Sequence, residues 1–277
     1  TKLKLFHGMY GKPKNMRAQP LDVSVVIPAY RAEHTIARAL NSVIAQSKPP
    51  REVIVVIDGS PDNTGSVAEI FCDKFQDTKY TVIHQENAGA GAARNLAVKT
   101  ATSTYLAFLD ADDAWLPEKL SRSFAVMEHS GLELVAHNYA AIAADGTTSA
   151  VDCAARFRKG PDPYSSLYRR GYLATSTLVV RRDLVTAAGG FDPSLPNAQD
   201  FDLWLAILQD RSIPFEVFDE ALTHYHVTEG SITAHTERRI KCCLDIALRF
   251  APSFSSGKYT NLWMRTLAVY FEAMHAY

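Results

Sequence analysis

Residues 105–113 of this 277-residue chain read Tyr-Leu-Ala-Phe-Leu-Asp-Ala-Asp-Asp, an apolar run followed by a stretch with three acids. Two runs of the same kind precede it: Val23–Ile27, which Pro28 follows, and Val53–Ile57, which Asp58 follows. Short runs rich in β-branched residues are typical of parallel strands covered on both faces. The three runs therefore predict neighbouring strands of a buried sheet.

Helical patterns separate these runs. Ile36, Leu40 and Val43 recur at helical spacing after the first run, and residues 63–75 form the next helical pattern. After a further strand at 80–83, residues 89–99 read as a helix that begins with glycines. Repeated strand–helix units at this spacing predict an α/β fold with a mostly parallel sheet and helices on both faces.

The rest of the chain is less regular. A helix is expected from about Leu116, with Asp113 as its cap, and strands are expected at 132–139 and 175–180. Asp145-Gly146 predicts a hairpin turn, and two helices are expected beyond residue 235. We therefore expect a basic N-terminal arm over residues 1–20, the α/β domain over 21–234 and a C-terminal helical extension over 235–277.

The composition excludes several classes of protein. The chain is 47% hydrophobic and 21% charged, which is incompatible with wholesale disorder. Its 29 basic and 30 acidic residues give a net charge of -1, so it has no global charge for binding nucleic acid. No apolar run is long enough to cross a bilayer, and no secretory signal is visible. The cysteines lack metal-site spacing, so we expect free thiols and a cytoplasmic location.

Two segments leave their partner open. Residues 1–20 contain five basic residues and no acid, which suits either a mobile arm or contact with an anionic membrane at its inner face. The last helix places apolar side chains on one face: Trp263, Leu267, Tyr270, Phe271 and Met274. This face suits a homodimer, a membrane surface or ordinary packing on the domain.

Polar clusters follow each predicted strand. They are Pro28-Ala29-Tyr30, Asp58-Gly59-Ser60 and Asp110-Ala111-Asp112. In parallel sheets ligands bind beyond the carboxyl ends of the strands, so we expect these clusters to face one crevice. Two carboxylates separated by one residue can share Mg²⁺ or Mn²⁺, which keep coordination positions open for substrate phosphates. Taken alone, the same acids would also suit a solvated turn.

Two further features are less specific. Asp58 could accept an N–H from the edge of a pyrimidine base, or it could simply form an Asp-Gly turn. The glycine-rich segment 87–95 opens a helix but matches neither the dinucleotide fingerprint nor the P-loop. Its small residues allow close approach, and Arg94 could reach a phosphate or an acid.

As an ordered series, these clusters resemble the family 2 glycosyltransferases, which have the GT-A fold. The matching segments are 23–30, 58–64, 87–95, 108–113, 189–192 and 199–204. The resemblance covers about residues 22–234. It implies a site for a nucleotide-diphosphate sugar formed by Pro28, Ala29, Tyr30, Asp58, Gly89, Arg94, Asp110, Ala111 and Asp112.

The resemblance also implies individual roles. Pro28, Tyr30 and Asp58 would hold the nucleoside, and Asp110 and Asp112 the ribose and the divalent metal. His226, in a late segment that resembles the family, is a further candidate metal ligand. Asp200 would match the catalytic base that takes a proton from the acceptor hydroxyl.

The sequence departs from the family pattern at two positions. Gln199 stands where the family usually has a second acid before the base, and Ile57 where it often has an acid before Asp58. Asp200 and Asp58 remain, so activity is still expected. The Q-x-x-R-W segment of processive polysaccharide synthases is absent from the sequence, which favours an enzyme that adds a single sugar.

The expected function is therefore an inverting, metal-dependent glycosyltransferase in surface polysaccharide or glycan synthesis. It would use a nucleotide sugar, with uridine diphosphate favoured, and a carbohydrate or lipid-linked acceptor. A sugar-phosphate nucleotidyltransferase is one alternative, but it would need a Gly- and Arg-rich loop after the first strand. A non-catalytic sugar-nucleotide-binding partner is the other, because of Gln199 and Ile57.

Overall fold

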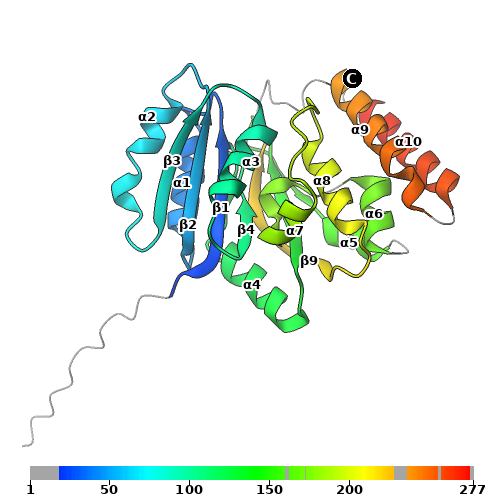
Figure 1. Ribbon diagram of the computed structural model, residues 1–277, viewed down its shortest axis with the longest axis horizontal. Coiled ribbons are helices and arrows are strands. Elements are labelled where there is room, and N and C mark those ends of the chain that lie inside the picture. The colour runs from blue at the N-terminus through cyan, green and yellow to red at the C-terminus, as the bar shows by residue number, and fades with distance from the viewer. Residues whose placement is uncertain (1–18, 160–161, 172, 228–235, 255–256, 275–277) are drawn as a thin grey trace, which may run out of the picture.

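The computed structural model describes residues 19–159, 162–171, 173–227, 236–254 and 257–274 (Figure 1). Its centre is a nine-stranded sheet. Four strands lie parallel to one another in the order β3-β2-β1-β4. Their bounds are β1 Leu21–Ala29, β2 Pro50–Asp58, β3 Lys79–Gln85 and β4 Tyr105–Phe108.

The second half of the sheet is mixed. Strand β8 (Val179–Arg181) runs antiparallel to β4, and β6 (Leu134–Ile142) runs antiparallel to β8. Strand β9 (Phe215–His226) is parallel to β6. The short strands β5 (Ala114–Trp115) and β7 (Thr148–Val151) run antiparallel to β9 and β6.

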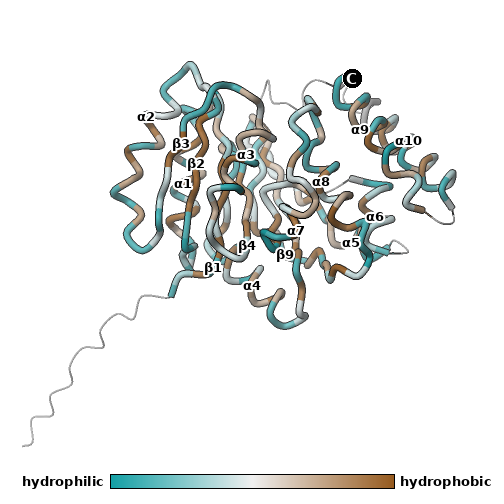
Figure 2. Tube along the Cα trace, in the orientation of Figure 1, coloured by the Kyte–Doolittle hydropathy of each residue, from teal (hydrophilic) through white to brown (hydrophobic). Residues whose placement is uncertain are grey.

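Helices cover both faces of the sheet because alternate strand residues point to opposite sides. Val25 and Ile27 join one core cluster with α1 (Ile36–Ile44), α2 (Thr64–Glu69) and α4 (Lys119–Ser130). Val26 joins the other, which includes residues of α3 (Ala90–Thr100), α6 (Pro163–Arg170), α8 (Gln199–Leu208) and α9 (Thr236–Phe250). Figure 2 shows the hydrophobic stretches of the central strands lying between the helices.

The remaining elements are short, apart from the last helix. They are α5 (Cys153–Arg158), α7 (Arg182–Ala187), α10 (Lys258–Met274) and the 3₁₀ turns η1 (Cys72–Lys74), η2 (Thr175–Thr177) and η4 (Ala251–Ser253). Helices α9 and α10 lie side by side at the opposite end of the molecule from α2 (Figure 1). None of the helices in the described ranges is long and apolar enough to span a membrane.

The structure confirms the α/β class, the parallel first half, the helices on both faces and the C-terminal helices. All four cysteines are free. Three details of the prediction were wrong. The expected strand over 175–180 is the turn η2 followed by β8, and the helix expected over 63–75 is α2 followed by η1. Asp113 does not cap α4, because Glu118 is the residue at that position.

Candidate active site

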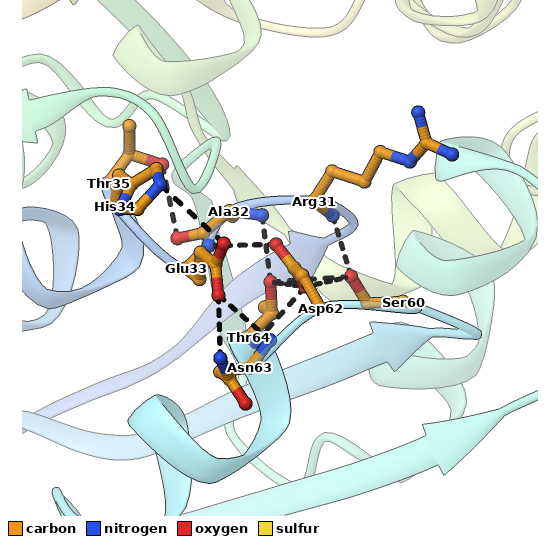
Figure 3. A network of polar contacts seen from close by, with 9 residues as sticks. All are labelled: Arg31, Ala32, Glu33, His34, Thr35, Ser60, Asp62, Asn63 and Thr64. Atoms are coloured by element: carbon orange, nitrogen blue, oxygen red, sulfur yellow. Dashed lines mark hydrogen bonds and ion pairs between the residues drawn. The ribbon is translucent and has the colours of Figure 1, made fainter.

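Two loops at the carboxyl ends of β1 and β2 are joined by side-chain hydrogen bonds (Figure 3). The Asp62 carboxylate accepts from the hydroxyls of Ser60 and Thr64, each at 2.6 Å. The Thr64 hydroxyl also accepts from the backbone N of Ala32 at 2.8 Å, and the Ser60 hydroxyl from that of Arg31 at 2.7 Å. Burial alone would raise the pKa of Asp62, but the hydrogen bonds that its carboxylate accepts, chiefly from Ser60 and Thr64, outweigh burial and lower the pKa to about 2.

Asp58 ends β2 and holds the glycine-rich loop. Its carboxylate is 3% exposed and accepts from Gln85 Nε2 at 2.7 Å and from the backbone N of Ala88 and Gly89 at 2.8 and 2.9 Å. These bonds direct the carboxylate toward the protein's own loop. The assignment of Asp58 to a nucleotide base stays a prediction, and its observed contacts position Gly89.

Gly59 allows this loop to approach the end of β2. Its φ is +61°, and a Cβ at this position would lie 2.5 Å from the backbone N of Asn87. Only glycine fits such a left-handed conformation at this distance. The glycine after Asp58 therefore has a structural reason that is independent of any ligand.

The β1 end offers one exposed ring. Ala29 is buried and Pro28 half-buried, whereas the Tyr30 ring is 46% exposed. The Arg31 guanidinium lies 5.4 Å from the centre of that ring. Of the three predicted residues, Tyr30 presents the most surface for stacking on a planar ligand.

Arg94 lies among the acids of the predicted site. Its side chain comes from α3, is 10% exposed and forms an ion pair with Asp110 at 2.5 Å. Burial would lower the pKa of Arg94, but the negative charges of Asp110, Asp200 and Asp112 outweigh it and raise the pKa. One buried cation thus interacts with acids at the end of β4 and with an acid of α8.

Asp200 lies in the first turn of α8, directly after Ala198 and Gln199. Its carboxylate accepts from the Thr175 hydroxyl at 2.9 Å and from the backbone N of Phe201 at 2.8 Å. Burial raises the pKa of Asp200, whereas Arg94 acts to lower it. The result is an oriented carboxylate that is more basic than an ordinary Asp.

The start of α8 is held close to α3. Ala198 has a φ of +57°, an uncommon conformation for a residue other than glycine. The Gln199 amide donates to the Leu195 carbonyl at 2.6 Å, and a Cβ added to Gly91 would lie 2.8 Å from its side chain. Gly91 of α3 therefore makes room for the segment that carries Asp200.

Asp113 is buried and binds two distant segments. It is 1% exposed, and its carboxylate accepts from the Ser176 hydroxyl at 2.5 Å and from the backbone N of His226 at 3.0 Å. The Ser176 hydroxyl in turn accepts from the backbone N of Asp110 at 3.0 Å. Asp113 thus joins the acidic loop, residues 110–113, to η2 and to the end of β9.

His226 is half-buried beside this loop, and burial together with Arg38 lowers its pKa, which favours the neutral imidazole that metals bind. Among the residues that the structure describes, no three His, Cys, Asp or Glu side chains gather to hold a metal ion. Carboxylates with a substrate diphosphate nevertheless form a usual Mg²⁺ site, and Asp110 and Asp112 fit this donor set. The assignment of Asp110, Asp112 and His226 as metal ligands stays a prediction.

Comparison with known proteins identifies the family. The sequence profile described as glycosyl transferase family 2 matches residues 24–177, more than half of the chain. The chain belongs to this family.

Named relatives of this family 2 glycosyltransferase include two Escherichia coli proteins. The UDP-Glc:alpha-D-GlcNAc-diphosphoundecaprenol beta-1,3-glucosyltransferase WfaP is 30% identical over 77% of this chain and 80% of its own length. The enzyme WfgD, which carries the same activity name, is 29% identical over 81% of this chain and 84% of its own length.

Solved structures share the GT-A fold. S. aureus TarS 1-349 in complex with UDP-GlcNAc has a TM-score of 0.71 at 21% identity, over 91% of this chain and 73% of that one. Mannosyltransferase PcManGT from Pyrobaculum calidifontis, in complex with GDP-Man and Mn²⁺, has a TM-score of 0.65 at 20% identity, over 96% of this chain and 80% of that one.

The structure of the family 2 glycosyltransferase brings Asp110, Asp112, Arg94 and Asp200 together. Sequence reasoning missed Arg38, Thr175 and Ser176. The Arg38 guanidinium donates to the Asp112 carbonyl at 2.5 Å, so it lies beside the acidic loop. An arginine on the helix after the first strand was the only local signal for it, and Thr175 and Ser176 had none.

Proposed function

We propose that this glycosyltransferase moves one sugar, with inversion, from a nucleotide-diphosphate sugar to an acceptor hydroxyl. The observation that carries this proposal is a cation shared by two acids. Arg94 forms an ion pair with Asp110 of the proposed donor site, and its charge also interacts with that of Asp200. The proposed base and the proposed donor site therefore adjoin each other. The acceptor hydroxyl would have to lie between them.

The chemistry follows from this geometry. The acceptor oxygen forms a bond to the anomeric carbon as the bond from that carbon to the diphosphate breaks, and the hydroxyl proton passes to Asp200. Attack opposite the leaving group inverts the anomeric centre. Burial raises the pKa of Asp200 and makes it more basic than an exposed carboxyl, while the charge of Arg94 favours its ionised form.

Asp112, with Asp110 and His226 as further candidates, would hold a divalent cation whose charge offsets that of the departing diphosphate. Carboxylate ligands favour Mg²⁺ or Mn²⁺. PcManGT, which shares the fold, is named as a complex with GDP-Man and Mn²⁺, and this name supports a metal. The cation can be identified by removing bound metal with a chelator and measuring which added ion restores activity.

Tyr30 and Pro28 would contact the base of the donor. A UDP-sugar is favoured because both named relatives are UDP-Glc enzymes and TarS was solved with UDP-GlcNAc. The same relatives use an acceptor linked to diphosphoundecaprenol. We extend this to a lipid-linked acceptor in surface polysaccharide synthesis, with the enzyme at the inner face of the membrane, as a monomer or a homodimer.

The test is transfer from a panel of UDP-sugars, with Mn²⁺, to a GlcNAc-diphosphate-lipid analogue, with the product detected by mass spectrometry. Asp200→Asn should lower turnover by roughly 10²-fold or more while UDP still raises the melting temperature. Asp210→Asn, which changes an exposed acid just beyond the C-terminal end of α8, is the matched control. Full turnover in Asp200→Asn would reject the base assignment.

The same assay addresses the remaining alternatives. A non-catalytic partner would bind UDP but give no product with any donor in the panel. Retention instead of inversion would appear as an anomeric coupling in the NMR spectrum of the product that matches the donor. A metal-independent enzyme would keep its activity after treatment with a chelator.

A further inference from the structure

Helix α10 packs on the domain through a face that includes two polar side chains, and it leaves an aromatic face in solvent. On the packed side Asn261 is 4% exposed and accepts from Arg169 Nε at 2.6 Å. Arg265 is 2% exposed, with its guanidinium 4.6 Å from the Phe201 ring. Val269 is also buried and Leu262 packs against the core, so the packed face mixes polar and apolar side chains while large aromatic side chains stay in solvent.

The aromatic face forms one continuous stripe. At 3.6 residues per turn, the exposed large apolar residues of α10 fall within about 140° of one another and extend over roughly 18 Å. Their exposed fractions are Tyr259 80%, Trp263 63%, Met264 40%, Tyr270 57% and Phe271 57%. No charged residue of α10 whose side chain the structure describes falls within this stripe.

The stripe concentrates exposed apolar surface at one end of the molecule. Of the ten large apolar residues that are exposed in the described part of the chain, five belong to α10. Contiguous patches of this kind mark interaction surfaces, whereas single exposed apolar residues are normal. The partner must therefore offer an apolar layer along the length of the helix.

We propose that this stripe binds the headgroup layer of an acidic lipid membrane. Tyr and Trp side chains favour this layer because each joins an apolar ring to a polar atom. Charge favours the same partner. On α9, which packs beside α10, the basic residues Arg238, Arg239 and Lys241 exceed the acids Glu237 and Asp245.

Acidic lipids would neutralise this basic excess. The proposal also suits the proposed function, on which it partly rests, because a lipid-linked acceptor lies in that layer. A stripe on one helix gives reversible, peripheral binding.

The tryptophans make the proposal directly measurable. Trp115 and Trp204 are 4% and 0% exposed, so a change in emission on adding vesicles reports on Trp263. The probe is a vesicle of phosphatidylcholine and phosphatidylglycerol without any lipid-linked sugar. We expect a blue shift of the emission, quenching by brominated lipid, and co-flotation of the protein that weakens with added salt.

Trp263→Ser should weaken flotation roughly tenfold, because about one exposed aromatic side chain is lost from the lipid contact. Tyr259→Ser should act in the same direction, and Trp263→Phe should retain most of the binding. Ile70→Ser removes a 67% exposed apolar residue at the far end of the molecule and should leave binding unchanged. Equal melting temperatures would confirm that these variants fold.

Failure to float, or equal loss in Trp263→Ser and Ile70→Ser, would overturn the proposal. So would a dimer in light scattering that Trp263→Ser dissociates, because the stripe would then bind a second copy. These assays contain neither donor nor acceptor, so they do not depend on the proposed function. Vesicle binding without sugar transfer would reject that function alone, and transfer to a soluble acceptor without vesicle binding would reject the lipid contact alone.

Discussion

At the scale of single residues, Arg94 sets the charge balance of the site. Arg94 forms an ion pair with Asp110 and lies near Asp200. Without Arg94, the negative charges of these neighbouring acids would be less neutralised. A nearby cation lowers the pKa of a carboxyl, so loss of Arg94 should raise the pKa of Asp200 further. The ionised form is the proton acceptor in the proposed mechanism.

We therefore predict that in Arg94→Met the rising limb of the pH profile of kcat moves to higher pH. Arg94→Lys, which keeps the positive charge, should stay closer to the wild-type profile. The measurement is single-sugar transfer at saturating substrates across the acid range. An unchanged midpoint in Arg94→Met would show that Arg94 does not control the base.

Ser176 joins the acidic loop to η2, since its hydroxyl donates to Asp113 and accepts from the backbone N of Asp110. Ser176→Ala leaves the buried Asp113 carboxylate and the backbone N of Asp110 without this partner, and we predict a loss of about 1–3 kcal/mol in the free energy of unfolding. Donor KM should rise because the loop is less fixed. Urea denaturation and steady-state kinetics measure the two effects.

Ser123→Ala is the matched control for this substitution. Ser123 is equally buried, and its hydroxyl has no hydrogen-bond partner in the described part of the chain. Its replacement should leave the free energy of unfolding unchanged or slightly higher. A similar loss in both variants would mean that the Ser176 bonds contribute no more than burial of a small side chain.

The positions of the site residues were predictable only where their neighbours in sequence signal them. The acids after β4 stand together in sequence, and their position after an apolar run was enough to place them at the sheet edge. Asp113 looked like a helix cap, because its real partners lie 63 and 113 residues away. Nothing near Asp113 in sequence signals those contacts.

At the scale of elements, Glu52 ties the parallel strands together. Its buried carboxylate accepts from Ser24 at 2.6 Å, from the Thr102 backbone N at 2.8 Å and from Lys79 at 3.1 Å. Burial alone would raise the pKa of Glu52, but these bonds outweigh it and lower the pKa to about 2. One carboxylate thus connects β1, β2, β3 and the loop before β4.

A carboxyl with a lowered pKa stabilises the fold above its ordinary value of 4.5, and this contribution is lost as the pH falls toward about 2. We predict that Glu52→Gln lowers the free energy of unfolding at pH 7 by up to roughly 3 kcal/mol. The difference should shrink steadily as the pH falls below 4.5. Urea midpoints measured across the acid range give this dependence.

Glu128→Gln, which changes an exposed carboxyl on α4, provides the control. It should leave the midpoints close to those of the wild type at every pH. A pH-independent deficit in Glu52→Gln would indicate lost packing instead of a lost charge.

Elements were predictable in proportion to the regularity of their burial. Strands β1, β2 and β4 each contain an apolar run that is covered on both faces, and β3 lies beside β2. All four strands could therefore be located from the sequence. Strand β9 was missed, because its pairing with β6 shifts register twice and its residues alternate irregularly between buried and exposed. A sequence period of two is lost under those conditions.

At the scale of the whole molecule, the boundary predicted at residue 235 separates groups that share one core. Ile246, Ala247 and Phe250 of α9 lie in the same cluster as Trp204 and Phe201 of α8. Arg249 also donates to Asp202 of α8 at 2.7 Å. The C-terminal helices therefore cover the helix that carries Asp200.

We accordingly predict that a chain ending at residue 234 loses its cooperative thermal transition and collects in the insoluble fraction. The physical reason is exposure of Trp204 and its neighbours, each buried large side chain contributing about 1.5–3 kcal/mol. Leu248→Ser, at a 59% exposed position of α9, should melt as the wild type does and thus separate loss of the helix face from loss of the core. If the shortened chain instead melts cooperatively and transfers sugar, residues 235–277 are an appendage, and α8 needs no support from them to orient Asp200.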